Sequence, residues 1–342
     1  VYKRQMTTHG DRGSPGGGLE VVDGSLTFGP DFTFRSRRNG SKILVDGPRF
    51  TNDGTIIADV NEYANGADVP EPGLTIHVGG VSTSGHEFYQ NGHLTVVDGY
   101  EIRVEATQMF NAGEIELRGG DLTGSGVDLI NTGMFRGRGL FVSTGDGAFH
   151  NRGTLNVGDV KAFGEDPAGQ LGVLQIISDF TQDATGELRL DLARSVPGLA
   201  YDQLIITGDA TLGGRLEVSL LDGFVPPIGH SFVILNAVAG IQGTFDEVLI
   251  VGGGAGLSWN LSYEPAAVNL TFRLLQDGDF NADGHVDGAD FLAWQRGESS
   301  DPFSATDLAD WQANYGSADP LSATSTRVPE PSLLALFVMA FG

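Results

Sequence analysis

Three segments repeat at twenty-residue spacing: Met109-Phe-Asn-Ala-Gly-Glu-Ile115, Leu129-Ile-Asn-Thr-Gly-Met-Phe135 and Phe149-His-Asn-Arg-Gly-Thr-Leu155. Each centres on an Asn-x-Gly triplet that is flanked on both sides by apolar residues. A repeat this short cannot enclose a core alone, so successive repeats must stack and bury a shared one. The spacing therefore predicts a mainly β chain, a parallel β-helix or solenoid with rungs of about twenty residues. We expect Asn111, Asn131 and Asn151 to stack as a hydrogen-bonded ladder at one corner.

The series extends toward the N-terminus. Asn91-Gly92 lies one period earlier and Asn52-Asp-Gly54 two periods before that, with Pro72-Gly-Leu-Thr-Ile-His-Val78 in the place of the rung between. We expect the glycine of each triplet to supply a positive φ at the corner. An antiparallel sandwich with repeated Asn-Gly hairpins is the alternative, although hairpin repeats rarely keep so constant a period.

Beyond about residue 170 the period ends but strand patterns continue, as in Val173-Leu-Gln-Ile-Ile177. We predict a solenoid over 21–165 and a β-rich C-terminal cap over 166–275, because a solenoid must close its last open edge. The whole of 21–275 resembles the autotransporter-like β-helical surface proteins of environmental bacteria. Residues 1–20 are expected to be a disordered, non-native tail outside the fold.

Residues 279–290 read Asp-Phe-Asn-Ala-Asp-Gly-His-Val-Asp-Gly-Ala-Asp, with oxygen-bearing side chains at the alternating positions of a calcium-binding loop. Gly284 stands at the sixth position, where such loops turn sharply. A hard cation suits this oxygen set, so the sequence predicts one bound Ca²⁺. The predicted ligands are Asp279, Asn281, Asp283, the backbone carbonyl of His285, Asp287 and Asp290.

The segment after the loop is duplicated. Asp290-Phe-Leu-Ala-Trp-Gln-Arg296 recurs seventeen residues later as Asp307-Leu-Ala-Asp-Trp-Gln-Ala313. Each copy can present one apolar helical face to the other, so we expect two short helices that pack face to face. A Ca²⁺ loop before a short helix, with no helix in front of it, resembles the EF-hand-like type I dockerin of bacterial extracellular proteins. The resemblance assigns a dockerin-like module to 276–318. In that family both halves bind Ca²⁺, but residues 296–307 lack the alternating oxygens and the central Gly, so the second site is expected to be lost and a cohesin partner stays open.

Near the end of the chain, a Ser/Thr/Ala-rich linker (319–328) leads to Val328-Pro-Glu-Pro331 and an apolar run, Leu333-Leu-Ala-Leu-Phe-Val-Met-Ala-Phe341. Residues 329–342 resemble the start of a PEP-CTERM sorting signal, which implies handling by an exosortase at the bacterial envelope. In that family a membrane-spanning helix and a basic cluster follow the motif. A span needs ~20 apolar residues, so the signal is expected to be truncated here.

Composition narrows the function. The chain has no Cys, which excludes thiol catalysis and Cys-ligated zinc, and its net charge of -24 argues against nucleic acid as a partner. His77, His86, Glu87 and His93 lie near one another in the sequence but lack the spacing of a metal site. No Gly-x-Ser-x-Gly motif is present and no carboxylate pair stands out from the repeat.

These observations predict a non-enzymatic, secreted or cell-surface protein with a structural or adhesin-like role, sorted to the membrane through its C-terminal segment, with a polysaccharide or envelope matrix as its partner. The alternative is a carbohydrate-active β-helix, a polysaccharide lyase or hydrolase carrying a dockerin. A groove with clustered carboxylates, Arg or Lys and exposed aromatic residues would favour the enzyme.

Overall fold

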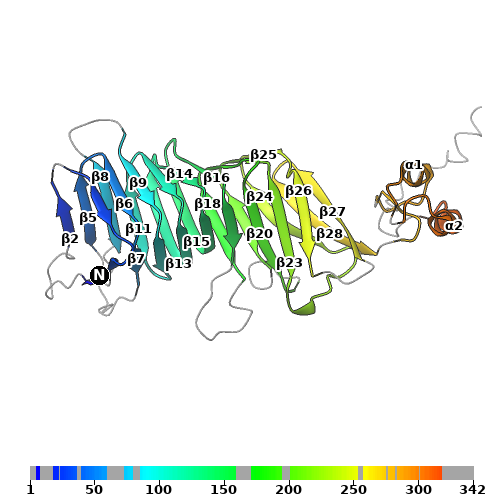
Figure 1. The fold of residues 1–342 in the computed structure, drawn as a ribbon, viewed down its shortest axis with the longest axis horizontal. Helices are drawn as coiled ribbons and strands as arrows, with labels where there is room; N and C mark the ends of the chain where they lie inside the picture. Colours follow the sequence, from blue (N-terminus) through cyan, green and yellow to red (C-terminus); the bar gives the residue numbers. More distant parts are fainter. Residues whose placement is uncertain are drawn as a thin grey trace, which may run out of the picture. The chain divides into compact units, whose positions relative to one another are not determined.

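The computed structural model describes residues 5–7, 18–22, 24–36, 40–59, 73–79, 85–158, 171–194, 201–252, 257–274, 276–281, 283–299 and 301–317. The chain is mainly β and its strands form parallel sheets of the solenoid type (Figure 1). It divides into two compact units, one of residues 1–254 and 261–270 and the other of residues 255–260 and 271–342.

One side of the solenoid is a nine-stranded sheet in which every strand pairs in parallel with the next along the stack. Parallel pairing rules out the antiparallel sandwich for these segments, because hairpins join antiparallel strands. The strands are β3 (Leu26–Phe28), β6 (Arg49–Asn52), β9 (Glu87–Gln90), β12 (Gln108–Asn111), β14 (Asp128–Asn131), β16 (Ala148–Asn151), β19 (Asp179–Gln182), β22 (Asp209–Leu212) and β25 (Gly240–Gly243).

The other sheet has nineteen strands and contains two parallel runs. The first run is β1 (Gln5–Thr7), β4 (Thr33–Ser36), β7 (Thr55–Ala58), β10 (His93–Val97), the first halves of β13 (Glu114–Ser125) and β15 (Met134–Thr144), β17 (Thr154–Val157), β20 (Glu187–Leu192), β23 (Arg215–Leu220) and β26 (Glu247–Val251). The second is β2 (Gly18–Val21), β5 (Ser41–Asp46), β8 (Leu74–Gly79), β11 (Glu101–Glu105), the second halves of β13 and β15, β18 (Val173–Ile177), β21 (Gln203–Ile206) and β24 (Ser231–Ala237). Between two neighbouring strands of the nine-stranded sheet the chain therefore passes once through each run.

The register corrects several expectations. Asn111, Asn131 and Asn151 pair in succession, but Gln90 rather than Asn91 pairs with Asn111. Asn52 pairs directly with Gln90, so no rung lies between them. Strand β8, expected to form that rung, belongs to the other sheet, because the coil that starts at β6 is longer than the repeat. Parallel pairing also continues past residue 165 into the expected cap, as far as Val251 in the nineteen-stranded sheet and Gly243 in the nine-stranded sheet.

Strands β1 and β2 lie largely within residues 1–20, which the sequence predicted to be a tail outside the fold, and they pair with β4 and β5. At the other end, β27 (Leu257–Glu264) and β28 (Ala267–Leu274) are neighbours in the nineteen-stranded sheet and are joined by the turn at Pro265 and Ala266. The Pro265 carbonyl accepts a hydrogen bond from the Ile241 amide of β25, the last strand of the nine-stranded sheet, at 3.0 Å. The turn therefore satisfies part of an edge that would otherwise be open to pairing with another chain.

The core is a column of side chains that point inward from each coil. Phe50, Phe88 and Phe149 are fully buried, and the rings of Phe50 and Phe88 stack with centroids 4.9 Å apart. Strict alternation of buried and partly exposed residues along each short strand places these side chains inside. Burying each such ring contributes ~1.5–3 kcal/mol relative to leaving it in water.

A second inward column consists of amides and confirms the predicted ladder. Asn111 Nδ2 donates to Asn131 Oδ1 at 2.7 Å, and Asn131 Nδ2 donates to Asn151 Oδ1 at 2.8 Å. Gln182 continues the column above Asn151, and Asn52 bonds Gln90 below it. The amide nitrogens of Asn111 and Asn131 also donate to the backbone carbonyls of Met134 and Thr154. All of these amide side chains are buried, so their hydrogen bonds hold the coils in one register.

The glycines of the triplets serve a different purpose from the one expected. Gly113, Gly133 and Gly153 are not among the described residues with positive φ. A Cβ on Gly133 would instead lie 2.3 Å from the Gly113 carbonyl oxygen, and one on Gly153 would lie 2.3 Å from the Gly133 carbonyl oxygen. The corner therefore requires Gly because the coils approach each other too closely for any side chain.

We predict that Gly133→Ala lowers the free energy of unfolding by about 1–3 kcal/mol, the typical cost of forcing atoms into a packed interior. Gly29→Ala is the matched control, because a Cβ there meets no atom within 4 Å and its φ is not positive. Urea unfolding of both variants measures the difference. Equal denaturation midpoints for the two variants would show that the corner is not closely packed.

Candidate metal-binding loop

Two short helices, α1 (Gly288–Arg296) and α2 (Ala305–Asn314), follow the predicted loop. Asp287 caps α1 by accepting a hydrogen bond from the Ala289 amide at 2.7 Å, and the Asp290 side chain accepts one from the Asp287 amide at 2.8 Å. This reciprocal arrangement is a capping box, and Gly297 ends the helix in the left-handed conformation. Ser304 caps α2 in the same position relative to its helix.

The two helices exchange hydrogen bonds through their tryptophans. Trp294 Nε1 donates to the carbonyl of Ser304 at 3.0 Å, and Trp311 Nε1 donates to the carbonyl of Asp287 at 2.7 Å. The tryptophans are seventeen residues apart, as are the two N-cap residues. The tryptophan of each half therefore bonds the backbone at the start of the other half's helix. The Phe291 ring packs against the Trp311 ring, with centroids 4.9 Å apart.

The side chains of the predicted ligands fold onto the loop's own backbone. Asp279 accepts hydrogen bonds from the amides of Asp283 (3.1 Å) and Gly284 (2.9 Å), while Asp290 accepts from the amides of Phe280 (2.8 Å) and Asn281 (3.1 Å). Asp279 and Asp290 are buried, whereas Asn281, Asp283 and Asp287 are exposed. Gly284 has a φ of 86°, as the sharp turn at the sixth position requires.

The middle of the loop is tied to the end of the module. The Val286 amide donates to the Ser317 carbonyl at 2.9 Å, and the Gly316 amide donates to the Val286 carbonyl at 2.8 Å. Gln276, before the loop, bonds the Ser317 hydroxyl. The end of the module is thus bonded to the loop backbone at Val286, and Gln276 is bonded to that end through Ser317.

The charges in the loop repel one another. Burial raises the pKa of Asp279 above its ordinary value of 3.8, the hydrogen bond from Gly284 opposes this rise, and the charges of Asp290 and Asp283 add to it. Within the described residues, no three His, Asp or Glu side chains are arranged to hold one metal ion. The set nevertheless suits a hard cation, because carboxylates already crowd around Asp279 and the His285 carbonyl and Asn281 amide supply neutral oxygens.

The second half keeps only part of this arrangement. Asp307, the counterpart of Asp290, is buried and accepts a hydrogen bond from the Asp301 amide at 3.0 Å. Arg296 and Phe303 stand where the first half has Asp279 and Val286. Phe303 is 63% exposed with a φ of 61°, whereas Val286 is fully buried. The loop's first carboxylate is therefore replaced by a cation, in keeping with the predicted loss of a second site.

Charged side chains on the outside of the solenoid pair across neighbouring strands. Between β20 and β23, Arg215 pairs with Glu187 at 3.5 Å and Arg189 with Glu217 at 3.9 Å, and each arginine also pairs with the carboxylate on its own strand. A similar group on β13 and β15 joins Arg136 to Glu114 at 2.6 Å. Each of these carboxylates lies against an arginine, as in other cross-strand pairs of opposite charge. None of them is therefore free to act as a catalytic acid or base.

The histidines near the N-terminal coils are dispersed. His77 pairs with Glu105 at 2.9 Å and His93 with Glu114 at 3.0 Å, whereas Glu87 bonds Arg49. His77 and His93 lie in different runs of the nineteen-stranded sheet, and Glu87 lies in the nine-stranded sheet. They are not brought together as a site.

The half-exposed aromatic residues also pack against one another. The rings of Tyr89 and Phe110 stack 4.8 Å apart on adjacent strands, and the Arg49 guanidinium lies 4.6 Å from the centre of the Tyr89 ring. These contacts cover both faces of the Tyr89 ring and one face of the Phe110 ring, and a sugar stacks on an open ring face. The aromatic feature expected of a polysaccharide-degrading groove is therefore not formed by these residues.

One outward carboxylate pair is electrostatically strained. Glu101 and Asp121 are register partners on β11 and β13. Burial raises the pKa of Asp121 above 3.8, the charge of Glu101 raises it further, a hydrogen bond from Leu140 opposes the rise, and Asp98 adds to it.

The sequence matches no protein-family model, and no curated protein matches it. Neither helix in the described part of the chain is long and apolar enough to cross a membrane. The expected linker and sorting signal, 319–342, lie outside the described residues.

We predict that Asp121→Asn stabilises the chain more as pH rises. Because the pKa of Asp121 is raised by folding, its favourable contribution is present at acid pH and is lost as pH rises through the folded pKa. Asparagine can still accept the Leu140 hydrogen bond but carries no charge. Urea unfolding at about pH 3 and about pH 7 should show the variant gaining stability relative to the wild type between the two. A pH-independent difference would contradict the repulsion.

Proposed function

We propose that this chain is a non-enzymatic extracellular or cell-surface protein: a structural or adhesin-like β-solenoid with rungs of about twenty residues in its regular part, joined to a dockerin-like module that binds one Ca²⁺. The observation that carries the calcium proposal is the loop at 279–290, whose Asp, Asn and Gly positions match the calcium pattern and whose Asp279 is buried beside like charges. The proposed ligands are Asp279, Asn281, Asp283, the His285 carbonyl, Asp287 and Asp290. A bound cation would relieve the repulsion among these carboxylates, so Ca²⁺ binding should stabilise the module.

The location is part of the same proposal. An acidic chain without cysteine, a dockerin-like module and the Pro-Glu-Pro motif are typical of an exported bacterial protein that is sorted at the envelope, here by exosortase-type machinery. A cohesin is left open as a partner, because Arg296 and Phe303 alter the second half on which a symmetric double-site surface depends.

The structural role is favoured over catalysis by the pairing on the solenoid surface. The arginines of β15, β20 and β23 lie against carboxylates of their own and neighbouring strands, and the Tyr89–Phe110 stack turns its ring faces along the coil axis. A polysaccharide lyase or hydrolase needs unpaired acid and base groups around a groove. The rival reading stands if such an activity is found.

We predict that calorimetric titration of the full chain at about 1 mM Ca²⁺ finds one site. Asp283→Ala removes a proposed ligand and should abolish or strongly weaken binding. Because this side chain is exposed, its removal leaves no cavity in the folded module. Asp301→Ala removes the same charge from the exposed second half and should leave the affinity within about twofold. Two equivalent sites, or no difference between these variants, would refute the assignment.

The tryptophans offer a second comparison. Trp311→Phe removes the hydrogen bond to the Asp287 carbonyl at the calcium loop, whereas Trp294→Phe removes its counterpart at Ser304. Losing one hydrogen bond costs ~1 kcal/mol, so Ca²⁺ affinity should fall about fivefold in the first variant only. If both substitutions changed the Ca²⁺ affinity equally, the hydrogen bond at the 279–290 loop would have no special role in binding, and the prediction would be wrong.

For the solenoid, the prediction is that the full chain with Ca²⁺ releases no oligosaccharide and no ultraviolet-absorbing unsaturated product from pectins, alginates, glucans or sulfated galactans. Chromatography of the reducing ends measures release. Turnover that a single Asp or Glu substitution removes would replace the structural role with the enzymatic one.

A further inference from the structure

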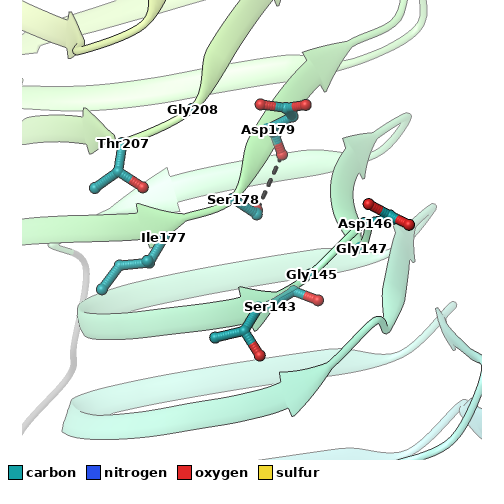
Figure 2. Close-up of a pocket in the computed structure, with 10 residues that line it drawn as sticks. Ser143, Gly145, Asp146, Gly147, Ile177, Ser178, Asp179, Thr207 and Gly208 are labelled. Atoms are coloured by element: carbon teal, nitrogen blue, oxygen red, sulfur yellow. Dashed lines mark hydrogen bonds between the residues drawn. The ribbon is translucent and has the colours of Figure 1, made fainter.

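A polar recess lies at one corner of the solenoid, where the nineteen-stranded sheet passes into the nine-stranded sheet (Figure 2). Its volume is about 480 Å³, and it spans the ends of β15, β18 and β21 on three successive coils. Sites for small ligands typically enclose ~300–1,000 Å³, so the recess is large enough for a small organic molecule.

The recess exists because the corner changes length from coil to coil. Three residues, Gly145 to Gly147, join β15 to β16, whereas Ser178 alone joins β18 to β19. Gly145 has a φ of 78°, which allows the longer turn to fold back. On the next coil, a Cβ on Gly208 would lie 2.2 Å from Asp179 Oδ1, so only Gly leaves that carboxylate in place.

The lining is rich in hydroxyl and carboxylate groups. Thr144, Ser178 and Thr207 contribute hydroxyls, and Asp146 and Asp179 contribute exposed carboxylates. Asp179 Oδ1 accepts a hydrogen bond from the Asp209 amide at 2.9 Å, and Ser178 Oγ donates to the Asp179 carbonyl at 3.0 Å. Within the described part of the chain, the side chains of Thr144, Asp146 and Thr207 form no hydrogen bond. Three polar groups are therefore free to bind a ligand.

This chemistry excludes most ligand classes. No Arg, Lys or His lines the recess, so an anion would meet two carboxylates without a compensating charge. Ile177 is the one large apolar side chain in the lining, which is too little surface for an apolar ligand. A divalent cation is disfavoured because only two carboxylates line the recess, and Asp179 Oδ1 already accepts a hydrogen bond from the Asp209 amide.

We propose that this recess binds a neutral saccharide. Sugar hydroxyls both donate and accept hydrogen bonds. Thr144 and Thr207 lie two strand spacings apart, ~9.6 Å, so hydroxyls on successive residues of an oligosaccharide can donate to the Asp146 carboxylate and bond with the Thr144 and Thr207 hydroxyls. The Ile177 side chain can contact the C–H face of a pyranose ring. The inference deepens the proposed adhesin-like function, on which it rests, by naming the class of ligand at one place on the solenoid.

The test uses the full chain and three kinds of trisaccharide: cellotriose and maltotriose as neutral probes, trigalacturonate as the anionic probe and the glucosamine trimer as the cationic one. Saturation-transfer NMR and calorimetry measure binding. We expect at least one neutral probe to bind at a single site, with dissociation constants of about 1 mM for so open a recess. Thr207→Val and Asp146→Ala should each weaken it about fivefold or more, as the loss of one hydrogen bond requires.

Thr51→Val and Asp31→Ala are the controls, because they remove the same groups from partly or fully exposed positions outside the recess lining. Thermal unfolding of all four variants should match that of the wild type. The proposal is overturned if no neutral probe binds at about 10 mM, if a charged probe binds more tightly, or if the recess variants bind as the controls do. Calcium titration and polysaccharide release do not depend on the recess, so this result and the failure of the proposed function can be told apart.

Discussion

The structure depends on the pairing of buried amides between coils. Asn111, Asn131 and Asn151 are fully buried, and each would cost free energy if its polar atoms lacked partners. A shift of one residue in any strand would turn its amide outward and its neighbour inward. Burial and hydrogen bonding therefore select the same register. The column has one break, since Asn111 Oδ1 has no partner among the described residues, at the point where the spacing changes from twenty to twenty-one.

Outside this column, the same stacking determines which charged side chains on the solenoid surface lie next to each other. Side chains on adjacent coils lie one strand spacing apart. Opposite charges such as Glu187 and Arg215 therefore pair, and like charges such as Glu101 and Asp121 repel each other. Distinct chemistry arises only where the repeat is interrupted, as at the turn from Thr144 to Gly147. The proposed calcium loop belongs to the other unit. There the tryptophan of each half of a duplicated segment donates to the N-cap carbonyl of the other half's helix.

Much of this was predictable. The Asn-x-Gly spacing predicted parallel stacking and the ladder, and the Trp294 and Trp311 repeat predicted two facing helices. Gln90 and Gln182 were missed as members of the ladder, because they lie off the twenty-residue period and Gln replaces Asn. The role of the corner glycines was also missed, since close approach between coils cannot be read from one repeat. The recess arises because the turn at Gly145–Gly147 is longer than the turn at Ser178. No sequence motif marks that difference.

Hydrogen exchange of the side-chain amides tests the ladder most directly. In ¹⁵N NMR spectra of the full chain, the Nδ2 hydrogens of Asn111, Asn131 and Asn151 should exchange with solvent far more slowly than those of the exposed Asn91, because each amide donates within the buried column. Exchange of the three buried amides at the rate of Asn91 would contradict the in-register stacking on which the account of this protein rests.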